Sequence, residues 1–329
     1  MTARPRVGFL GVGWIGRHRM EAMLKTGAIE AAAIADPSDD MAEEALRLAP
    51  GAVRVEGLED LLGAGLDGLV VATPSALHAE QSIAALERGL AVFCQKPLGR
   101  TAAEAREVVE AARRTDRLLA VDFSYRFTEG MKKVRDLVRG GGLGEVYAAD
   151  LVFHNAYGPD KGWFYDAALS GGGCVMDLGV HLIDLALWVL DYPRVISVSS
   201  HLLTGGKPLA DGQVEDYATA QVELDGGRSV RLACSWRLPA GREAVISAAF
   251  YGTSGGGALR NVGGSFYDFE SELYRGTSTE RLSGPPDDWG GRAAANWAVR
   301  LGQGERFDPE TERLVDVAAL VDRIYRREA

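Results

Sequence analysis

A glycine-rich turn near the amino terminus restricts the possible folds more than any other feature of this sequence. Gly11, Gly13 and Gly16 are spaced as G-x-G-x-x-G, after the apolar run 7–11 and before a helix-like segment that continues to Leu24. In that setting the first glycine permits a tight turn, the second lets the backbone approach a pyrophosphate, and the third lets the helix pack closely on a sheet. The helix N-terminus adds N–H donors and positive potential for phosphate groups. The turn therefore predicts a dinucleotide site whose contacts are Gly11, Gly13, Trp14, Ile15 and Gly16.

A carboxylate stands where such a site contacts the cofactor's ribose. Asp36 closes the next apolar run, 31–36, about 20 residues beyond the turn, where it can accept hydrogen bonds from both ribose hydroxyls. Because a carboxylate would repel a 2′-phosphate, Asp36 favours NAD(H) over NADP(H). The alternative is that Asp36 is only a turn residue before Pro37.

The pattern of the chain changes near residue 122. Up to that point, short apolar runs alternate with helix-like segments, which is typical of a doubly wound α/β domain with a parallel sheet. The predicted strands there are 7–11, 31–36, 68–73, 90–95 and 118–123. We therefore predict a Rossmann dinucleotide-binding domain at 1–122.

From about residue 123 the apolar pattern becomes longer alternating segments separated by Gly-rich turns, which predicts an open, mostly antiparallel sheet. The predicted strands there are 145–157, 214–224, 228–236, 243–251 and 265–274. We assign 123–329 to a second, α+β domain for substrate binding and oligomerisation. A helix predicted at 311–327 could pack on either domain.

The charge and the cysteines limit the partners and the compartment. With 36 Lys and Arg against 46 Asp and Glu, the formal net charge is -10, which opposes nucleic acid and anionic membranes as partners. Cys94, Cys174 and Cys234 have no metal-ligand spacing, and an odd number argues against a complete disulfide framework. Residues 1–6 contain no apolar signal core, and we find no stretch near the roughly 18 apolar residues of a membrane span. We expect a cytoplasmic protein that takes a small molecule.

Polar residues follow two further predicted strands at the same edge of the parallel sheet. Thr73, Pro74 and His78 come after strand 68–73, where an α/β sheet offers its ligand crevice, and we count them with the cofactor contacts. The alternative is a plain helix start with Ser75 as the cap and His78 in a packing role.

Gln95 and Lys96 end the strand 90–95 at that edge, and we count both with the cofactor contacts. The ammonium of Lys96 could donate to a substrate oxygen and stabilise the negative charge that develops there during hydride transfer. The alternative is a solvated lysine at a strand end.

A second group of polar residues lies in the apolar segment 170–190. Asp177, His181 and Asp184 fall on one helical stripe, and the rest of the segment is apolar nearly all round. An imidazole there could act as a general base for a hydroxyl proton, with Asp177 orienting it or holding a second hydroxyl, and Asp184 in support. The alternatives are a satisfied buried polar cluster and a metal site. We predict no metal, because one histidine without a thiol pair makes a poor ligand set.

Together these motifs resemble the Gfo/Idh/MocA family, which includes glucose–fructose oxidoreductase and inositol dehydrogenase. The resemblance rests on GVGWIG at 11–16, ATPSALH at 72–78, QKP at 95–97 and GGGCVMDLGVH at 171–181. It implies a Rossmann domain, a C-terminal sheet that often builds homodimers or homotetramers, and a catalytic set matched here by Lys96, Asp177 and His181. Family patterns also place Tyr125, Arg126 and Trp163 near the substrate.

One position departs from the family motif, which commonly has Glu before the lysine, whereas this chain has Gln95. The change removes a carboxylate next to Lys96, so we expect less electrostatic stabilisation of that ammonium.

Three classes of function remain open from the sequence. The first is an NAD(H)-dependent oxidoreductase acting on a hydroxyl or ketone of a sugar or polyol. The others are a glycoside hydrolase-like enzyme that retains its NAD, and a non-catalytic dinucleotide sensor. The complete Lys, Asp, His set favours the first class.

Overall fold

The computed structural model describes residues 3–326, which group into two compact units. The first unit contains residues 3–122 and 291–315, and the second contains 123–290 and 316–326. The two units carry different parts of the predicted site, so each is described by itself.

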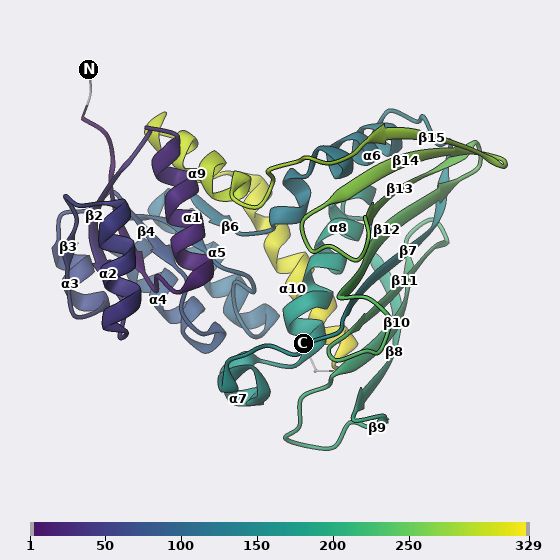
Figure 1. Cartoon of the computed structure of the whole chain (residues 1–329), viewed down its shortest axis with the longest axis horizontal. Helices are drawn as coiled ribbons and strands as arrows, with labels where there is room; N and C mark the ends of the chain where they lie inside the picture. Colours follow the sequence, from purple (N-terminus) through teal and green to yellow (C-terminus); the bar gives the residue numbers. More distant parts are fainter. Residues whose placement is uncertain (1–2, 327–329) are drawn as a thin grey trace. The chain divides into compact units, whose positions relative to one another are not determined.

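The first unit is built on a parallel sheet with the strand order β3-β2-β1-β4-β5-β6, which within residues 3–326 has six strands (Figure 1). The strands are β1 (Arg6–Leu10), β2 (Glu30–Ala35), β3 (Val53–Arg54), β4 (Gly68–Val71), β5 (Ala91–Cys94) and β6 (Leu119–Val121). Phe9, Ile34, Val70 and Phe93 are at most 1% exposed, as expected for strands covered on both faces. The predicted doubly wound topology is confirmed, and the exposed two-residue strand β3 was not predicted.

Helices connect these strands and cover the sheet. They are α1 (Trp14–Lys25), α2 (Asp39–Leu48), α3 (Leu58–Gly63), α4 (Ser75–Glu87) and α5 (Ala102–Thr115). Thr101 caps the N-terminus of α5, because its hydroxyl accepts the Glu104 N–H, and the Glu104 carboxylate accepts the N–H of Arg100. The carboxyl ends of β1, β2, β4 and β5 lead directly into the turns that hold the predicted cofactor contacts.

A late segment of the chain returns to this unit, which differs from the predicted domain limits. Residues 291–315 were assigned to the second domain, but α9 (Arg292–Gly302) packs on α1, and Trp297 contacts Phe93 at 5.9 Å between ring centroids. The reason is packing: Trp297 is 1% exposed and fills space left by Gly68, where a Cβ would lie 2.9 Å from its ring. The predicted C-terminal helix is the 3-10 turn Pro309–Glu312 followed by α10 (Arg313–Ile324), and its predicted end at Arg327 lies outside the described residues.

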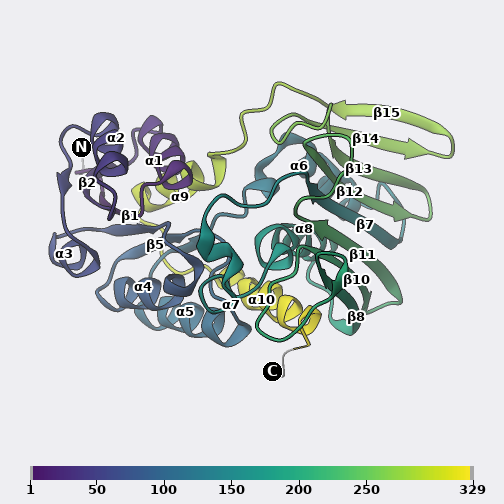
Figure 2. The same cartoon turned by 60° about the horizontal axis from the view of Figure 1, so that its bottom comes forward.

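The second unit is built on a mostly antiparallel sheet with the order β15-β14-β13-β12-β7-β11-β10-β8-β9, nine strands in the described part of the chain (Figure 2). The strands are β7 (Val146–Asn155), β8 (Val195–Thr204), β9 (Lys207–Pro208), β10 (Tyr217–Leu224), β11 (Arg228–Ser235), β12 (Ala244–Gly252), β13 (Gly255–Asn261), β14 (Phe269–Arg275) and β15 (Ser278–Ser283). Only the pair β7–β11 is parallel among these neighbours. The predicted sheet is confirmed, although β8, β9, β13 and β15 were not predicted.

Helices pack on one face of this sheet. These are α6 (Glu129–Arg139), which packs on β13 and β14, and α8 (Val180–Leu190), which packs on β7, β11 and β12 (Figure 1). The 3-10 turn Ser124–Phe127 precedes α6. The 3-10 turn Gly162–Tyr165, the short helix α7 (Ala167–Ser170) and a π-helical turn, Val175–Gly179, precede α8. The alternate residues of the central strands that face these helices are buried, for example Leu151, Leu232 and Phe250.

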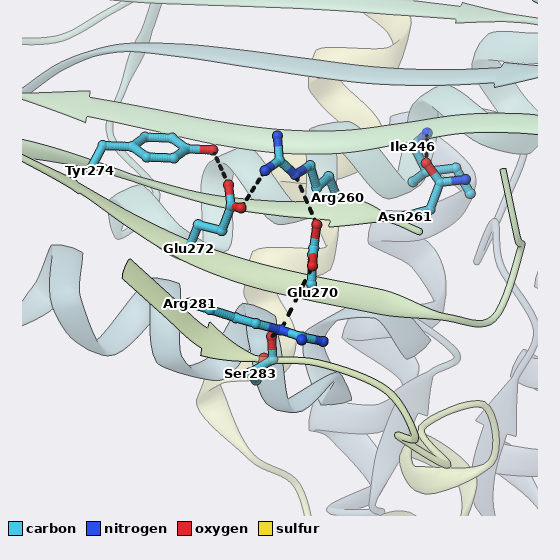
Figure 3. A network of polar contacts seen from close by, with 8 residues as sticks. All are labelled: Ile246, Arg260, Asn261, Glu270, Glu272, Tyr274, Arg281 and Ser283. Carbon is cyan, nitrogen blue, oxygen red and sulfur yellow. Dashed lines mark hydrogen bonds and ion pairs between the residues drawn. The ribbon is translucent and has the colours of Figure 1, made fainter. Parts of the chain in front are cut away.

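Residues on the other face of the sheet, which we call the open face, are mostly half-exposed or exposed, and they include charged side chains such as Asp150 and Arg231. One row runs across neighbouring strands through His201, Thr219, Ala233, Val152 and Ser247. A shallow basin of about 520 Å³ lies over the middle of this row. Toward the β15 edge the same face carries a charged network: Arg260 bonds to Glu270 and Glu272, Glu272 accepts the Tyr274 hydroxyl, and Arg281 pairs with Glu270 (Figure 3).

One segment differs from the expectation that no apolar stretch approaches membrane length. The helical stretch Ala167–Leu190 is long and apolar enough to cross a membrane, since an 18-residue window in it has a mean hydropathy of 1.7, but 89% of that window is buried inside the structure. Its apolar residues pack against the sheet, as Ile183 and Val189 do with no exposure. The composition of the stretch is that of a core helix.

Candidate active site

The glycine turn of the first unit has the geometry of a phosphate cradle. Gly11 has φ +84°, and a Cβ there would lie 2.5 Å from the Ala72 carbonyl oxygen. A Cβ at Gly16 would lie 2.2 Å from the carbonyl oxygen of Gly11. α1 begins at Trp14, and the described residues of its first turn include no acidic side chain. The positive end of the helix is therefore left for an anion, and the residues present fit a dinucleotide pyrophosphate.

Asp36 follows β2 and fixes the turn from the side. Its Oδ2 accepts the Val12 N–H at 2.7 Å, and its Oδ1 accepts the Ser38 N–H at 2.9 Å. Each oxygen keeps a further lone pair for a ribose hydroxyl. Two more carboxylates, Asp39 and Asp40, lie in the first turn of α2.

His78 is buried between two loops of the first unit. It is 1% exposed, with Nδ1 2.6 Å from the Pro97 carbonyl oxygen and Nε2 2.7 Å from the Thr73 carbonyl oxygen. Burial is the largest influence and lowers the pKa of His78, while the two carbonyl contacts favour the protonated ring. The ring therefore ties the loop after β4 to the loop after β5, in agreement with the packing role given above as the alternative, and its contact with the cofactor stays a prediction. The Thr73 hydroxyl is also engaged, donating to Gln81.

Gln95 and Lys96 follow β5 at the same edge, and Gln95 belongs to a buried network that the sequence did not reveal. The Gln95 amide donates to Asp122 Oδ2 at 2.8 Å, and Arg19 Nε donates to the same oxygen at 2.5 Å. The side chains of Arg19 and Asp122 are 7% and 1% exposed. A carboxylate thus remains beside this loop, but it is supplied by Asp122. Lys96 is half-buried.

In the second unit, Asp177 and His181 lie at the start of the long core helix. Asp177 is part of the π-helical turn, and its Oδ2 accepts the indole N–H of Trp236 at 3.0 Å. Trp236 follows β11 and is 3% exposed, so it fixes the carboxylate from the sheet side.

His181 is 8% exposed and sits among aromatic rings. Its ring centroid lies 5.0 Å from that of Tyr125 and 6.5 Å from those of Phe123 and Phe153. Tyr125 in turn packs on Trp289 at 4.8 Å. An imidazole in such a cluster has few alternative positions, which suits a group that must hold or move a proton at a fixed place.

Arg126 is bound to two side chains of the second unit, and its predicted contact with the substrate stays a prediction. Its guanidinium forms a two-pronged ion pair with Asp184 and donates to the Tyr192 hydroxyl at 2.7 Å. Burial raises the pKa of Asp184, and the cation of Arg126 opposes that shift. The three residues of the predicted stripe therefore have different partners. Asp177 accepts a hydrogen bond from Trp236, His181 packs among aromatic rings, and Asp184 forms an ion pair with Arg126. The reason is the π turn, which breaks the regular α-helical spacing.

Trp163 lies in a short aromatic run next to the same group. It stacks on Phe164 at 3.8 Å between ring centroids, and both Phe164 and Tyr165 meet Trp236 edge-on. Because Trp236 also holds Asp177, the aromatic run is linked to that carboxylate.

The sequence missed several residues that shape these sites. Arg19, Asp122, Trp236 and Glu215 were not singled out, although Asp122 is the next-to-last residue of the predicted strand 118–123 at the cofactor edge and Trp236 ends the predicted strand 228–236. Position at a strand end was the available signal for both. Among residues 3–326 there is no cluster of three metal-ligating side chains.

Comparison with known proteins identifies related chains. A family model described as an oxidoreductase family with an NAD-binding Rossmann fold matches residues 5–123, and a GFO/IDH/MocA C-terminal domain model matches residues 131–257. The rhizopine catabolism protein MocA of Rhizobium meliloti is 32% identical over 77% of this chain and 77% of its own length. D-glucoside 3-dehydrogenase of Escherichia coli is 33% identical, but the match spans 60% of this chain and 60% of that enzyme.

A solved structure of levoglucosan dehydrogenase, in complex with NADH and levoglucosan, has the same fold. Its TM-score is 0.83 over 98% of this chain and 97% of that chain, at 21% identity. Both domain models match in the expected order, and the MocA relative covers more than two thirds of the chain. The chain therefore belongs to the Gfo/Idh/MocA family of oxidoreductases.

Proposed function

We propose that this protein is a nicotinamide-dependent oxidoreductase that interconverts a hydroxyl and a ketone on a sugar, a polyol or a sugar-derived molecule. The observation that carries the proposal is the glycine turn. Neither Gly11 nor Gly16 has room for a Cβ, and the first turn of α1, all of it within the described residues, has no acidic side chain to compete with a phosphate group. Relatives named for action on a glucoside and on levoglucosan support the substrate class.

Residues of this chain would carry out the proton transfer and stabilise the charge on the substrate oxygen. A bound nicotinamide would accept or supply the hydride. We assign to His181 the removal of the hydroxyl proton in the oxidative direction and its return in the reductive direction. Lys96 donates a hydrogen bond to the substrate oxygen and stabilises its negative charge. Asp177, fixed by Trp236, orients the imidazole or holds a neighbouring hydroxyl.

The aromatic side chains of the second unit suit a ring-shaped substrate. Tyr125 packs against His181, and Trp163 is half-buried beside Phe164. Flat apolar faces next to a few directed polar groups are typical of small-molecule sites, and the C–H faces of a sugar match them. We propose Tyr125 and Trp163 as substrate contacts, and Arg126 as the residue that fixes Tyr125 through its pair with Asp184.

The function is tested by following the absorbance of reduced nicotinamide. Purified protein is mixed with NAD or NADP and a panel of sugars, inositols and sugar acids, with Lys96→Ala as the comparison. Turnover that the variant loses supports the proposal. Firmly held cofactor with no net reduction would instead favour a hydrolase that retains NAD, and cofactor-dependent binding to a protein without turnover would favour a sensor.

We further propose that NAD(H) is preferred to NADP(H). Asp36, Asp39 and Asp40 place three carboxylates at the end of β2 and the start of α2, and they outnumber the guanidinium of Arg54, which pairs with Asp39, so a 2′-phosphate would be repelled. Asp36→Ser removes the acceptor of the ribose hydroxyls. We expect the KM for NAD to rise about 10-fold to 100-fold, since a hydrogen bond to a charged group is worth roughly 1.5–3 kcal/mol, and the KM for NADP to fall.

Asp40→Asn is the matched control for this prediction, because it lowers the local negative charge by the same amount without touching the turn. Steady-state kinetics with both cofactors measure the two variants. An Asp40→Asn variant that shifts the preference as far as Asp36→Ser would contradict a specific role for Asp36.

The open face is the surface through which we propose that copies of the chain associate into a homodimer or homotetramer. Ala233 lies at its centre, between Thr219 and Val152, and a long charged side chain there would be buried without a partner. We expect Ala233→Arg to weaken self-association by at least about 100-fold, since burying an unpaired charge costs several kcal/mol. Light scattering after size exclusion measures the mass, with Ala233→Ser as the control. A wild-type monomer, or an Ala233→Arg oligomer of unchanged mass, would contradict this interface.

We also propose a cytoplasmic location. Cys94, Cys174 and Cys234 are all free and buried, and the sulfurs of Cys174 and Cys234 lie 3.8 Å apart without a bond. Neighbouring buried thiols without a disulfide bond are what we expect in a reducing compartment. Fractionation of cells that produce the tagged full chain tests the location.

A further inference from the structure

The backbone just before Asp177 is held by a single buried side chain, Glu215. Its Oε2 accepts the Gly173 N–H at 3.0 Å, and its Oε1 accepts the Val175 N–H at 2.8 Å. The N–H between them, that of Cys174, donates to the backbone carbonyl of Glu215 at 2.9 Å. Three consecutive N–H groups at the start of the helical segment therefore have one residue as their acceptor.

The surroundings of Glu215 are fitted to this arrangement. Glu215 has no exposed surface, and the Tyr325 hydroxyl donates to its Oε1 at 2.7 Å. A Cβ at Gly173 would lie 1.9 Å from the Glu215 carbonyl oxygen, and a Cβ at Gly172 would lie 2.1 Å from the Tyr325 hydroxyl oxygen. The second and third glycines of the run 171–173 are thus needed for Glu215 and Tyr325 to come close.

The negative charge of Glu215 also favours its position at the start of the helical segment. The first N–H groups of a helix lack partners within the helix and carry its positive potential, so a carboxylate there is stabilised and stabilises the helix end in return. Burial raises the pKa of Glu215, and the N–H and O–H donors counter this by favouring the charged form.

A short backbone path joins Glu215 to the proposed chemistry. Gly173, whose N–H bonds to the Glu215 carboxylate, accepts the Asp177 N–H on its carbonyl oxygen at 3.0 Å. Asp177 lies in the π turn Val175–Gly179, and His181 follows in the first turn of α8. A shift at Gly173 would therefore move the backbone of Asp177 and rotate the residues that follow it.

We propose that Glu215, with Tyr325, is a positioning residue that fixes the start of the helical segment and thereby sets Asp177 and His181 for hydroxyl–ketone interconversion. The proposal rests on the function proposed above. Glu215 itself does not contact a reacting group; it acts through the backbone of Gly173 and Val175.

The first test needs no substrate. Glu215→Gln keeps the side-chain shape, but its amide NH₂ would face a backbone N–H, so one of the two anchoring bonds is lost. We compare the ¹H–¹³C ring resonances of the five histidines in the wild type, Glu215→Gln and Glu223→Gln, with His181→Asn assigning the signal. Glu223 lies on β10 of the same unit, exposed, so it is a matched control. We expect the His181 signal to move and the amides of 173–177 to exchange faster in Glu215→Gln only.

The second test is kinetic. We expect Glu215→Gln to lower kcat roughly 10²-fold, the size of effect that a displacement near 1 Å can have, while the Kd for NAD stays at the wild-type value. Tyr325→Phe removes one donor and should give a smaller loss of the same kind. It also serves as the second variant if Glu215→Gln does not fold.

The outcomes separate this proposal from the function. A His181 signal and 173–177 exchange unchanged in both Glu215→Gln and Tyr325→Phe would overturn the positioning role. Equal losses of kcat and of NAD affinity would overturn it too, because they indicate general disruption. If the resonance and exchange change as expected while the wild type turns over no sugar or polyol, the positioning role stands and the proposed function fails.

Discussion

Replacing His181 with asparagine is expected to lower kcat by about 10²–10⁴-fold, the usual contribution of general acid–base catalysis. The imidazole is held against Tyr125 and near Phe123 and Phe153, so no neighbouring side chain can move into its place without disturbing a packed cluster. Asparagine cannot take up a proton at neutral pH. Stopped-flow or steady-state measurement of nicotinamide absorbance with a substrate from the panel gives the rate.

The pH dependence sharpens this expectation. In the oxidative direction a base must be neutral to accept the proton, so the wild-type rate should fall on the acid side, and that limb should disappear in His181→Asn. His201→Asn is the matched control, because His201 is exposed on β8 and points to the open face. A His181→Asn enzyme within about 3-fold of the wild type, or one that keeps the acid limb, would remove His181 from the chemistry and leave it a packing role.

The sequence predicts the elements that are buried and regular. The strands of the first unit are continuous apolar runs, and the central strands β7, β10, β11 and β12 alternate buried and more exposed residues over much of their length, so periodicity locates them. The missed strands have no such signal. β13 begins with three consecutive glycines, Gly255–Gly257, and β15 is the polar run Ser278–Ser283 near the edge of the sheet. Their strand form depends on pairing with neighbours, which no local pattern encodes.

The candidate site also contains residues that the sequence predicts and residues that it does not. The glycine turn and Asp36 could be predicted, because the spacing of these residues follows directly from the backbone geometry of such a turn. The role of Arg126 could not, since it depends on Asp184, 58 positions along the chain, and for His78 the sequence left packing and cofactor contact both open. Trp236 is linked to Asp177 across 59 positions of sequence. Motifs therefore identify which residues matter, whereas the three-dimensional contacts decide which of them face a ligand.

The buried network of Arg19, Asp122 and Gln95 yields the largest expected change in stability. Arg19→Met keeps an apolar stem of similar length but removes the cation that pairs with Asp122, whose side chain is 1% exposed. Breaking a buried ion pair by removing one partner typically costs about 3–5 kcal/mol, because a charge is left buried without compensation. We expect the midpoint of thermal unfolding to fall by roughly 10 °C, at about 2–4 °C per kcal/mol for a unit of this size. Differential scanning calorimetry measures the shift.

Arg17→Met is the matched control, because Arg17 lies one half-turn earlier on α1 and pairs with Glu44, whose side chain is 40% exposed. Exposed pairs contribute about 0–1 kcal/mol, so this variant should unfold at a temperature close to that of the wild type.

The double variant Arg19→Met, Asp122→Asn should recover much of the lost stability. The amide oxygen introduced in place of the carboxylate can still accept a hydrogen bond from the amide of Gln95, and no charge is left buried. Equal midpoints for Arg19→Met and Arg17→Met would contradict a buried pair. If the expected order is found, it also gives a physical reason for glutamine before Lys96: a glutamate at position 95 would place a second carboxylate beside Asp122, whereas the amide of Gln95 donates a hydrogen bond to that carboxylate.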